Sequence, residues 1–229
     1  RFKFDVAAAV FLTVVHRLMD PGSDRAAEKW RDDYAMPKGV LGLDLHQLYR
    51  AMAWLGEPLP KSEQEGRTPF APRCVKDKVE ERLFERRRDL FTEVAVIFFD
   101  TTSIYFEGAG GETIGKRGKS KDHRPDLNQM VAGLVIDGEG RPLCCELWPG
   151  NTTDVKSLIP IVDRLRKRFR VMDTCVVADR GMISKATLAE LEQRGIGYIL
   201  GARIRKQKEV KHEVLKRGGR YREVVPPRK

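Results

Sequence analysis

Two aspartates in the sequence each stand directly after a run of apolar residues. Residues 94–99 are apolar without a break and Asp100 follows them, while residues 175–178 are apolar and Asp179 follows. A short unbroken apolar run rich in β-branched and aromatic residues is typical of a strand that is buried on both faces. Open α/β sheets place their chemistry at the carboxyl ends of central strands. The pattern therefore predicts two carboxylates presented at strand ends.

Two carboxylates in such positions suit a particular chemistry. Mg²⁺ and Mn²⁺ prefer oxygen ligands, and two such ions ~3.5–4 Å apart can activate a nucleophile and stabilise the leaving oxygen of a phosphodiester. A sheet holds the backbone of a strand-end aspartate while its side chain projects into a wet cleft. One such aspartate alone is more often a turn former or a helix cap, but two of them favour a metal site. We therefore expect Asp100 and Asp179 to be catalytic residues and metal ligands.

The elements around these aspartates predict an α/β fold. We expect strands at 94–99, 128–136, 142–148, 171–178 and 196–200, and helices at 156–169 and 184–194. This order, β-β-β-α-β-α-β, is that of an RNase H-like fold, a mixed sheet flanked by helices. In that fold the first strand lies in the middle of the sheet and the fourth strand pairs beside it. The fold would bring Asp100 and Asp179 together.

Residues 1–93 predict an all-helical N-terminal region. Apolar residues at helical spacing indicate helices at about 1–20, 25–34, 45–55 and 75–90. In the last of these, Val79, Leu83 and Leu90 are expected to form the buried stripe. The predicted organisation is thus a helical region at 1–93, a catalytic domain at 94–202 and a basic tail at 203–229. The helical region either binds DNA or braces the catalytic domain.

The net charge of +10 is concentrated at one end of the chain. Residues 203–229 contain 11 basic and 3 acidic side chains, whereas residues 1–93 contain 17 and 16, and residues 94–202 contain 15 and 14. A basic segment suits binding to nucleic-acid phosphates, because each neutralised phosphate releases counterions. An ordinary solvated end has the same composition. No apolar run approaches the ~18 residues of a membrane-spanning helix, so we expect no membrane partner and a cytoplasmic location.

Four motifs contain or flank the two aspartates. In chain order they occupy residues 100–103 (Asp-Thr-Thr-Ser), 120–129, 149–154 (Pro-Gly-Asn-Thr-Thr-Asp) and 178–182 (Ala-Asp-Arg-Gly-Met). From about residue 94 to residue 202 the sequence resembles the DDE-type transposases of bacterial insertion sequences. The resemblance implies an RNase H-like domain that uses Mg²⁺ or Mn²⁺ to cut double-stranded DNA at element ends and joins the 3′ ends to a target. It also implies that the intact protein works as a homodimer or a larger assembly.

By this resemblance, Asp100 and Asp179 match the first and second acidic residues of a catalytic triad. The third residue in that family is a glutamate on a later helix; its pattern is a tyrosine, an arginine three residues on, and the glutamate four further. This sequence lacks that pattern, and Tyr221-Arg222-Glu223 has the residue types without the spacing. A β-rich insertion usually precedes the glutamate, and the basic tail is similar to its beginning. We therefore expect a fragment that binds Mg²⁺ weakly and cleaves DNA poorly by itself.

Basic residues near the two aspartates are the candidates for DNA contact. Four of them lie in the loop after the first strand and one directly follows Asp179: Lys119, Lys121, His123, Arg124 and Arg180. The family motif favours contact with DNA phosphates for the loop residues, and a solvated loop is the alternative.

Other interpretations of the same residues stay open. Asp154 is expected to cap the helix that follows it, or to support the site. A complete RNase H-like nuclease, such as a resolvase, would need a third acidic residue near the two aspartates, and Glu107 and Glu146 are the candidates. A DNA-binding remnant without catalysis would bind through the basic tail in a salt-sensitive manner that needs no metal.

Overall fold

The computed structural model describes residues 2–67, 72–88, 94–108, 110–111, 114–121, 123–182 and 184–201, together with residues 208, 210–214, 216 and 219. The chain divides into two compact units, Arg1–Arg87 and Arg88–Lys229. None of the helices in the described ranges is long and apolar enough to cross a lipid bilayer.

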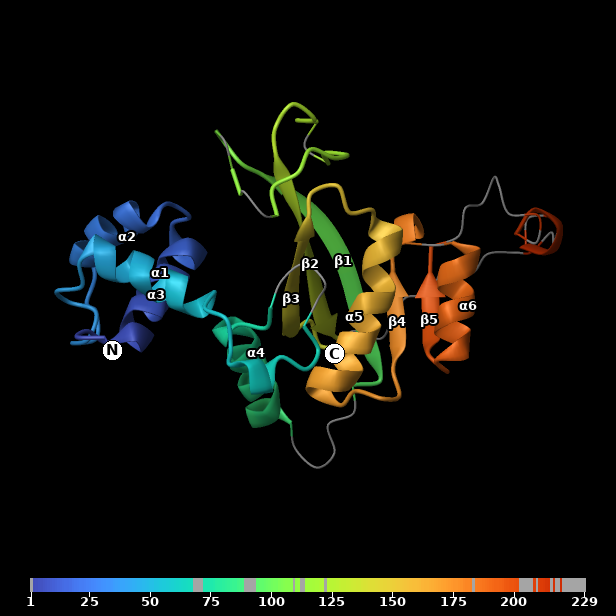
Figure 1. Cartoon of the computed structure of the whole chain (residues 1–229), viewed down its shortest axis with the longest axis horizontal. Coiled ribbons are helices and arrows are strands. Elements are labelled where there is room, and N and C mark those ends of the chain that lie inside the picture. The colour runs from blue at the N-terminus through green and yellow to red at the C-terminus, as the bar shows by residue number, and fades with distance from the viewer. Residues whose placement is uncertain are drawn as a thin grey trace. The chain divides into compact units, whose positions relative to one another are not determined.

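The first unit is built from helices, drawn from blue to green in Figure 1. They are α1 (Val6–Met19), α2 (Asp24–Trp30), the short η1 (Arg31–Asp33), α3 (Leu45–Leu55), the short η2 (Lys61–Glu63) and α4 (Val75–Arg87). Ser23 caps α2, since its Oγ accepts a hydrogen bond from the N–H of Ala26 at 3.2 Å. Apolar side chains of α1, α2 and α3 and of the loop before α3 form one core, made of Ala9, Leu12, Ala27, Trp30, Val40, Leu43, Leu48 and Ala51.

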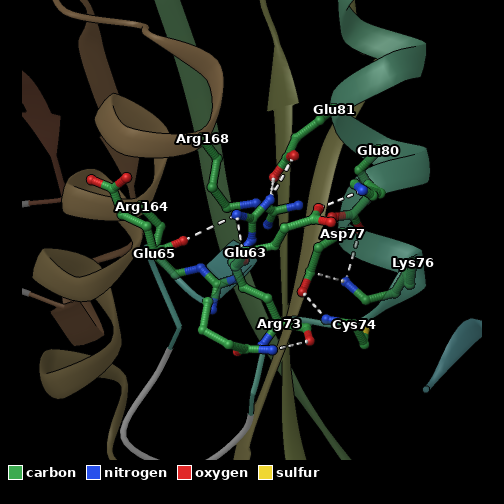
Figure 2. Close-up of polar contacts among 12 residues, drawn as sticks. Glu63, Glu65, Arg73, Cys74, Lys76, Asp77, Glu80, Glu81, Arg164 and Arg168 are labelled. Carbon is green, nitrogen blue, oxygen red and sulfur yellow. Dashed lines mark hydrogen bonds and ion pairs between the residues drawn. The ribbon is translucent and has the colours of Figure 1, made fainter. Parts of the chain in front are cut away.

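Polar contacts fix the start of α4. Figure 2 shows Arg73, whose Nη2 donates hydrogen bonds to both carboxylate oxygens of Glu81, at 2.6 and 2.7 Å. Its Nη1 donates to the backbone carbonyls of Glu63 and Glu65, at 3.0 and 3.1 Å. A bidentate arginine–carboxylate pair is a strong and directional contact. This arginine therefore ties the preceding loop to the helix.

The expected buried stripe of α4 was wrong. The buried residues of this helix are Asp77 and Phe84, whereas Val79 and Leu83 are exposed. Leu90 lies outside the described residues. The buried carboxylate of Asp77 is hydrogen-bonded: its Oδ2 accepts from the N–H of Cys74 at 2.9 Å, ahead of the first turn. The buried positions of this helix therefore include a hydrogen-bonded carboxylate that its apolar periodicity does not indicate.

The second unit contains a five-stranded mixed sheet. Its elements are β1 (Val96–Tyr105), β2 (Gln129–Asp137), β3 (Pro142–Pro149), α5 (Asp154–Phe169), β4 (Cys175–Ala178), the short η3 (Arg180–Met182), α6 (Lys185–Gln193), β5 (Gly197–Leu200) and η4 (Val210–Val214). The strand order is β3-β2-β1-β4-β5. The pairs β1–β2 and β2–β3 are antiparallel, and the pairs β1–β4 and β4–β5 are parallel. This is the topology of an RNase H-like fold, so the predicted fold class is confirmed.

Strand β1 differs from its prediction in length and burial. It continues through residues 100–105, which pair with β2 as far as Tyr105 opposite Gln129. Its side chains alternate between the two faces, so it is not buried on both. The buried positions are Ile97, Phe99, Thr101 and Ser103, and the exposed ones are Phe98, Asp100, Thr102 and Ile104. The strand was predicted to end at residue 99, but it continues because threonine suits a strand that is half exposed.

Helix α5 covers the buried face of β1. Figure 1 shows it lying along the sheet beside β1 and β4. Its inward side chains are Leu158, Ile161, Val162, Leu165 and Phe169. Across the sheet, Phe99 packs edge to face on Trp148 of β3, with ring centroids 6.2 Å apart. The core thus lies between α5 and one face of the sheet.

Candidate active site

Asp100 on β1 and Asp179, the residue directly after β4, stand at matching positions of two neighbouring strands. In the parallel ladder between β1 and β4, Phe99 pairs with Ala178, and the ladder ends there. Each aspartate is therefore the first residue beyond that ladder, although Asp100 itself continues to pair with Leu134 of β2. Both carboxylates are exposed. Asp100 is thus in mid-strand rather than at a strand end, but the two aspartates are brought together as the sequence predicts.

An open groove of about 470 Å³ contains both carboxylates. Its walls are Phe98, Phe99, Asp100, Lys121, Leu134, Ile136, Val177, Ala178 and Asp179. One cationic and two anionic side chains thus stand at the edge of an otherwise apolar groove.

The backbone and helix next to the groove add polar contacts. The carboxylate of Asp100 accepts a hydrogen bond from the N–H of Thr101 at 2.8 Å. Asp154 was expected to cap α5, and this was wrong: Thr153 occupies the N-cap position and Asp154 is the first helical residue. Its Oδ1 instead accepts a hydrogen bond from the hydroxyl of Thr101 at 2.7 Å. Because Thr101 and Asp154 are 53 positions apart, no local sequence pattern indicates this hydrogen bond. The prediction therefore assigned Asp154 the commoner role of a helix cap.

Gly181 separates two of the acidic side chains. A Cβ built on this glycine would lie 3.3 Å from Oδ2 of Asp154 and 3.7 Å from Oδ2 of Asp179. The absence of a side chain therefore leaves both carboxylates facing the same small space. Sequence reasoning gave Thr101 and Gly181 no role of their own, although each stands in a motif that contains a predicted acidic residue.

The predicted DNA-contacting residues are spread over the site. Lys121 lines the groove with the two aspartates. Lys119 and His123 are exposed loop residues, and His123 has a left-handed backbone, with φ of 58°. Arg180 is exposed in η3, directly after Asp179.

Arg124, in the loop after β1, lies near the end of that strand. Its guanidinium is 5.6 Å from the ring centroid of Tyr105. Tyr105 is five residues beyond Asp100 in β1, which is about 16 Å at the rise of a strand. It also donates two hydrogen bonds to Asp126, at 3.0 and 2.9 Å. These bonds hold the pKa of the Asp126 carboxyl below its usual value and raise the pKa of Arg124. Arg124 is therefore already partnered and stands away from the two aspartates.

Glu146 and Glu107 do not complete the site. Glu146 is buried, and its carboxylate lies 3.0 Å from Nε of Arg164 and 2.9 Å from Nη1 of Arg168. It pairs with Gly133, which in turn pairs with Thr101, so it belongs to the face of the sheet that α5 covers. Glu107 is exposed beyond the end of β1. Tyr221, Arg222 and Glu223 lie outside the described residues.

The two carboxylates of the groove suit a hard divalent cation but form only part of a metal site. Carboxylate oxygens are the ligands that Mg²⁺ and Mn²⁺ prefer, and those of Asp100 and Asp179 are exposed side by side. No group of three acidic, histidine or cysteine side chains with the spacing of a metal site occurs within the described ranges. The described residues therefore offer Asp100 and Asp179 as candidate oxygen ligands.

Comparison with known proteins places these residues in a family. A family model described as a transposase DDE domain matches residues 94–227, which is more than half of the chain. The chain belongs to the DDE transposase domain family. The predicted family is thus confirmed, and a search of curated proteins found no significant match.

The solved structures that match the chain include transposase complexes. A Mos1 transposase paired-end complex with the left transposon end matches at 12% identity with a TM-score of 0.32, covering 86% of this chain and 59% of that chain. A Mos1 mariner paired-end complex with Mn matches at 13% identity with a TM-score of 0.30, covering 86% and 59%. A piggyBac transposase synaptic complex with hairpin DNA matches at 15% identity with a TM-score of 0.44, covering 89% and 42%. This DDE-family chain thus spans 42% to 59% of the length of these proteins.

Proposed function

We propose that the second unit is the catalytic core of a DNA transposase, which cleaves DNA strands with a divalent metal and transfers their 3′ ends to a target. The observation that carries this proposal is the position of Asp100 and Asp179, side by side beyond the β1–β4 ladder of a DDE-family domain. Double-stranded DNA is the proposed partner and the cytoplasm the proposed location. A homodimer is the proposed assembly of the whole protein, because two element ends are processed together.

In this proposal each groove residue has a separate task. Asp100 and Asp179 would hold Mg²⁺ or Mn²⁺ through their exposed carboxylates. The bound metal would supply activation of the attacking oxygen and stabilisation of the leaving oxygen. Lys121 and Arg180 would contact phosphate oxygens on either side of the reacting one, with Lys119 and His123 further out along the same strand of DNA. The rigid sheet keeps the carboxylates in place without reorganisation.

A third carboxylate would complete the centre in the whole protein. The sequence lacks the tyrosine, arginine and glutamate pattern that supplies it in the family. We therefore propose that these 229 residues alone bind the metal weakly and cleave DNA slowly or not at all.

Metal binding tests this proposal without requiring turnover. Mn²⁺ is titrated into the chain and the free ion is measured by electron paramagnetic resonance. Asp100→Asn and Asp179→Asn should each weaken Mn²⁺ binding by about tenfold or more, since each removes a charged ligand. Asp173→Asn, which changes another exposed aspartate just before β4, is the matched control and should leave the affinity unchanged. Equal affinity for all four proteins would overturn the metal site.

DNA binding separates catalysis from passive binding. Binding of a duplex is measured with Mn²⁺ and with a chelator, at several salt concentrations. A transposase core should bind DNA more tightly when the metal is present, because the ion bridges carboxylates and phosphate. A DNA-binding remnant would show the same salt-dependent affinity under both conditions.

A further inference from the structure

Three side chains from distant parts of the chain form a continuous polar chain at the groove. The hydroxyl of Thr101 lies 2.7 Å from Oδ1 of Asp154 and 3.1 Å from Nζ of Lys121. The same ammonium group also donates to the backbone carbonyl of Thr101. Thr101 is 3% exposed. A buried hydroxyl thus connects a cation on the loop after β1 with an anion at the start of α5.

The chemistry of the groups fixes the direction of both hydrogen bonds. A protonated lysine has only donors, and an ionised carboxylate has only acceptors. The hydroxyl of Thr101 must therefore accept from Lys121 and donate to Asp154. Bonds to charged groups are shorter and stronger than neutral ones. The single hydroxyl couples the positions of the two charges.

The backbone of the same loop is also attached to the sheet. The N–H of Lys121 donates to Oγ of Ser103 at 2.9 Å. Lys116 exchanges two backbone hydrogen bonds with Gln129, both of 3.0 Å. The loop therefore has little freedom at Lys121, and its hydrogen bonds to Thr101 orient the rest of the side chain. The ammonium is held at the wall of the groove that contains Asp100 and Asp179.

Asp154 contributes a charge as well as a hydrogen-bond acceptor. Its second oxygen faces the space at Gly181 that the carboxylate of Asp179 also faces. It stands in the first turn of α5, where a negative charge is favoured by the helix dipole. The start of the helix therefore favours a negative charge at Asp154, beside the site.

We propose that Thr101 and Asp154 are positioning residues, which hold the Lys121 ammonium beside the two aspartates so that it contacts a phosphate of the bound DNA. The inference rests on the proposed function only for the identity of the phosphate. Asp154 acts through Thr101, and Thr101 acts through Lys121. Neither residue needs to touch the DNA itself.

Lysine labelling tests the positioning directly. The chain is treated briefly with an amine-acylating reagent, and modification of each lysine is measured by mass spectrometry. Lys185, an exposed lysine at the start of α6, is the internal control. Thr101→Val has nearly the same shape without the hydroxyl, and should raise the labelling rate of Lys121 about fivefold, which corresponds to the loss of about one hydrogen bond. Thr101→Ser keeps the hydroxyl and should label at the wild-type rate.

A second variant, Asp154→Ala, tests the proposal independently in case Thr101→Val does not fold. Asp154→Ala leaves Thr101 intact but removes the acceptor of its hydroxyl, and should also raise the labelling of Lys121 while that of Lys185 stays constant. Unchanged labelling of Lys121 in both Thr101→Val and Asp154→Ala would overturn the proposal. The proposal would also be wrong if Thr101→Ser labelled as fast as Thr101→Val, because methyl packing would then be the cause.

DNA binding distinguishes failure of this inference from failure of the proposed function. Thr101→Val and Lys121→Met should both lower the slope of log affinity against log salt by about one, the loss of one phosphate contact. Thr101→Ser should keep the wild-type slope. If labelling changes as expected but the wild-type chain binds no duplex, the positioning stands and the proposed function fails. If Lys121→Met lowers the slope and Thr101→Val does not, the positioning is wrong and the DNA-binding function stands.

Discussion

Asp100 and Asp179 occupy the first positions beyond one parallel ladder, since Phe99 and Ala178 are its last pair. The separation in sequence is large, yet the register of two strands alone decides that the carboxylates are neighbours. Because the β1 ladder with β2 continues past this point, the backbone of Asp100 is held by β2, while its side chain is exposed to solvent. The arrangement is rigid and solvent-accessible at once.

This adjacency predicts non-additive effects on metal binding. If one ion is shared by both carboxylates, the double variant Asp100→Asn/Asp179→Asn should bind Mn²⁺ about as weakly as the weaker single variant, with a coupling of roughly 1 kcal/mol or more. Calorimetric titration of the four proteins gives the coupling. If the losses of Mn²⁺-binding free energy in the two single variants added up in the double variant, two independent ions would be indicated. Each aspartate would then need its own further ligands.

Removing the partner of Arg124 should strengthen binding to DNA. Asp126 holds Arg124 by two hydrogen bonds and neutralises its charge. Asp126→Asn frees the guanidinium for phosphate, so the slope of log affinity against log salt should rise by about one. Fluorescence anisotropy with a labelled duplex measures it.

The matched control for that change lies at the other end of β2. Glu139→Gln alters the ion pair with Arg141 in the β2–β3 turn and adds the same net charge. A similar gain from both variants would show that overall charge, rather than the position of Arg124, determines the affinity.

The sequence predicted the order of strands and helices because the strands of the second unit contain short apolar runs, such as residues 96–99 and 175–178. The pairing of β1 with β4 followed from that order, and so did the meeting of the two aspartates. The end of β1 was not predicted, since residues 100–105 are held in the strand by pairing with β2 rather than by their own apolarity. The polar contact between Thr101 and Asp154 also escaped prediction, because it depends on how α5 is placed over the sheet. Sequence patterns thus predicted the order of the elements well, and the side-chain contacts between elements poorly.

Gly133 should be essential to the core between β1 and β3. A Cβ at this position would lie 2.5 Å from the ring of Trp148 and 2.8 Å from the ring of Phe99. Gly133→Ala would force both rings apart and should lower the free energy of unfolding by about 1–3 kcal/mol. Urea unfolding followed by tryptophan fluorescence measures the change. Gly138→Ala, in the turn where a Cβ meets nothing within 4 Å, should leave the midpoint almost unchanged.

Glu146 should stabilise the second unit strongly. Its buried carboxylate is shared by Arg164 and Arg168, both of α5, at 3.0 and 2.9 Å. Glu146→Gln keeps the shape but leaves two buried guanidinium groups without this charge, so the free energy of unfolding should fall by about 3 kcal/mol. The measurement is urea unfolding, and the control is Glu139→Gln. The carboxylate of Glu139 is exposed, so its removal should lower the free energy of unfolding by less than about 1 kcal/mol. Equal stability of the two variants would contradict a structural role for Glu146. If Glu146→Gln instead kept its stability and lost Mn²⁺ binding, Glu146 would be the third carboxylate of the site after all.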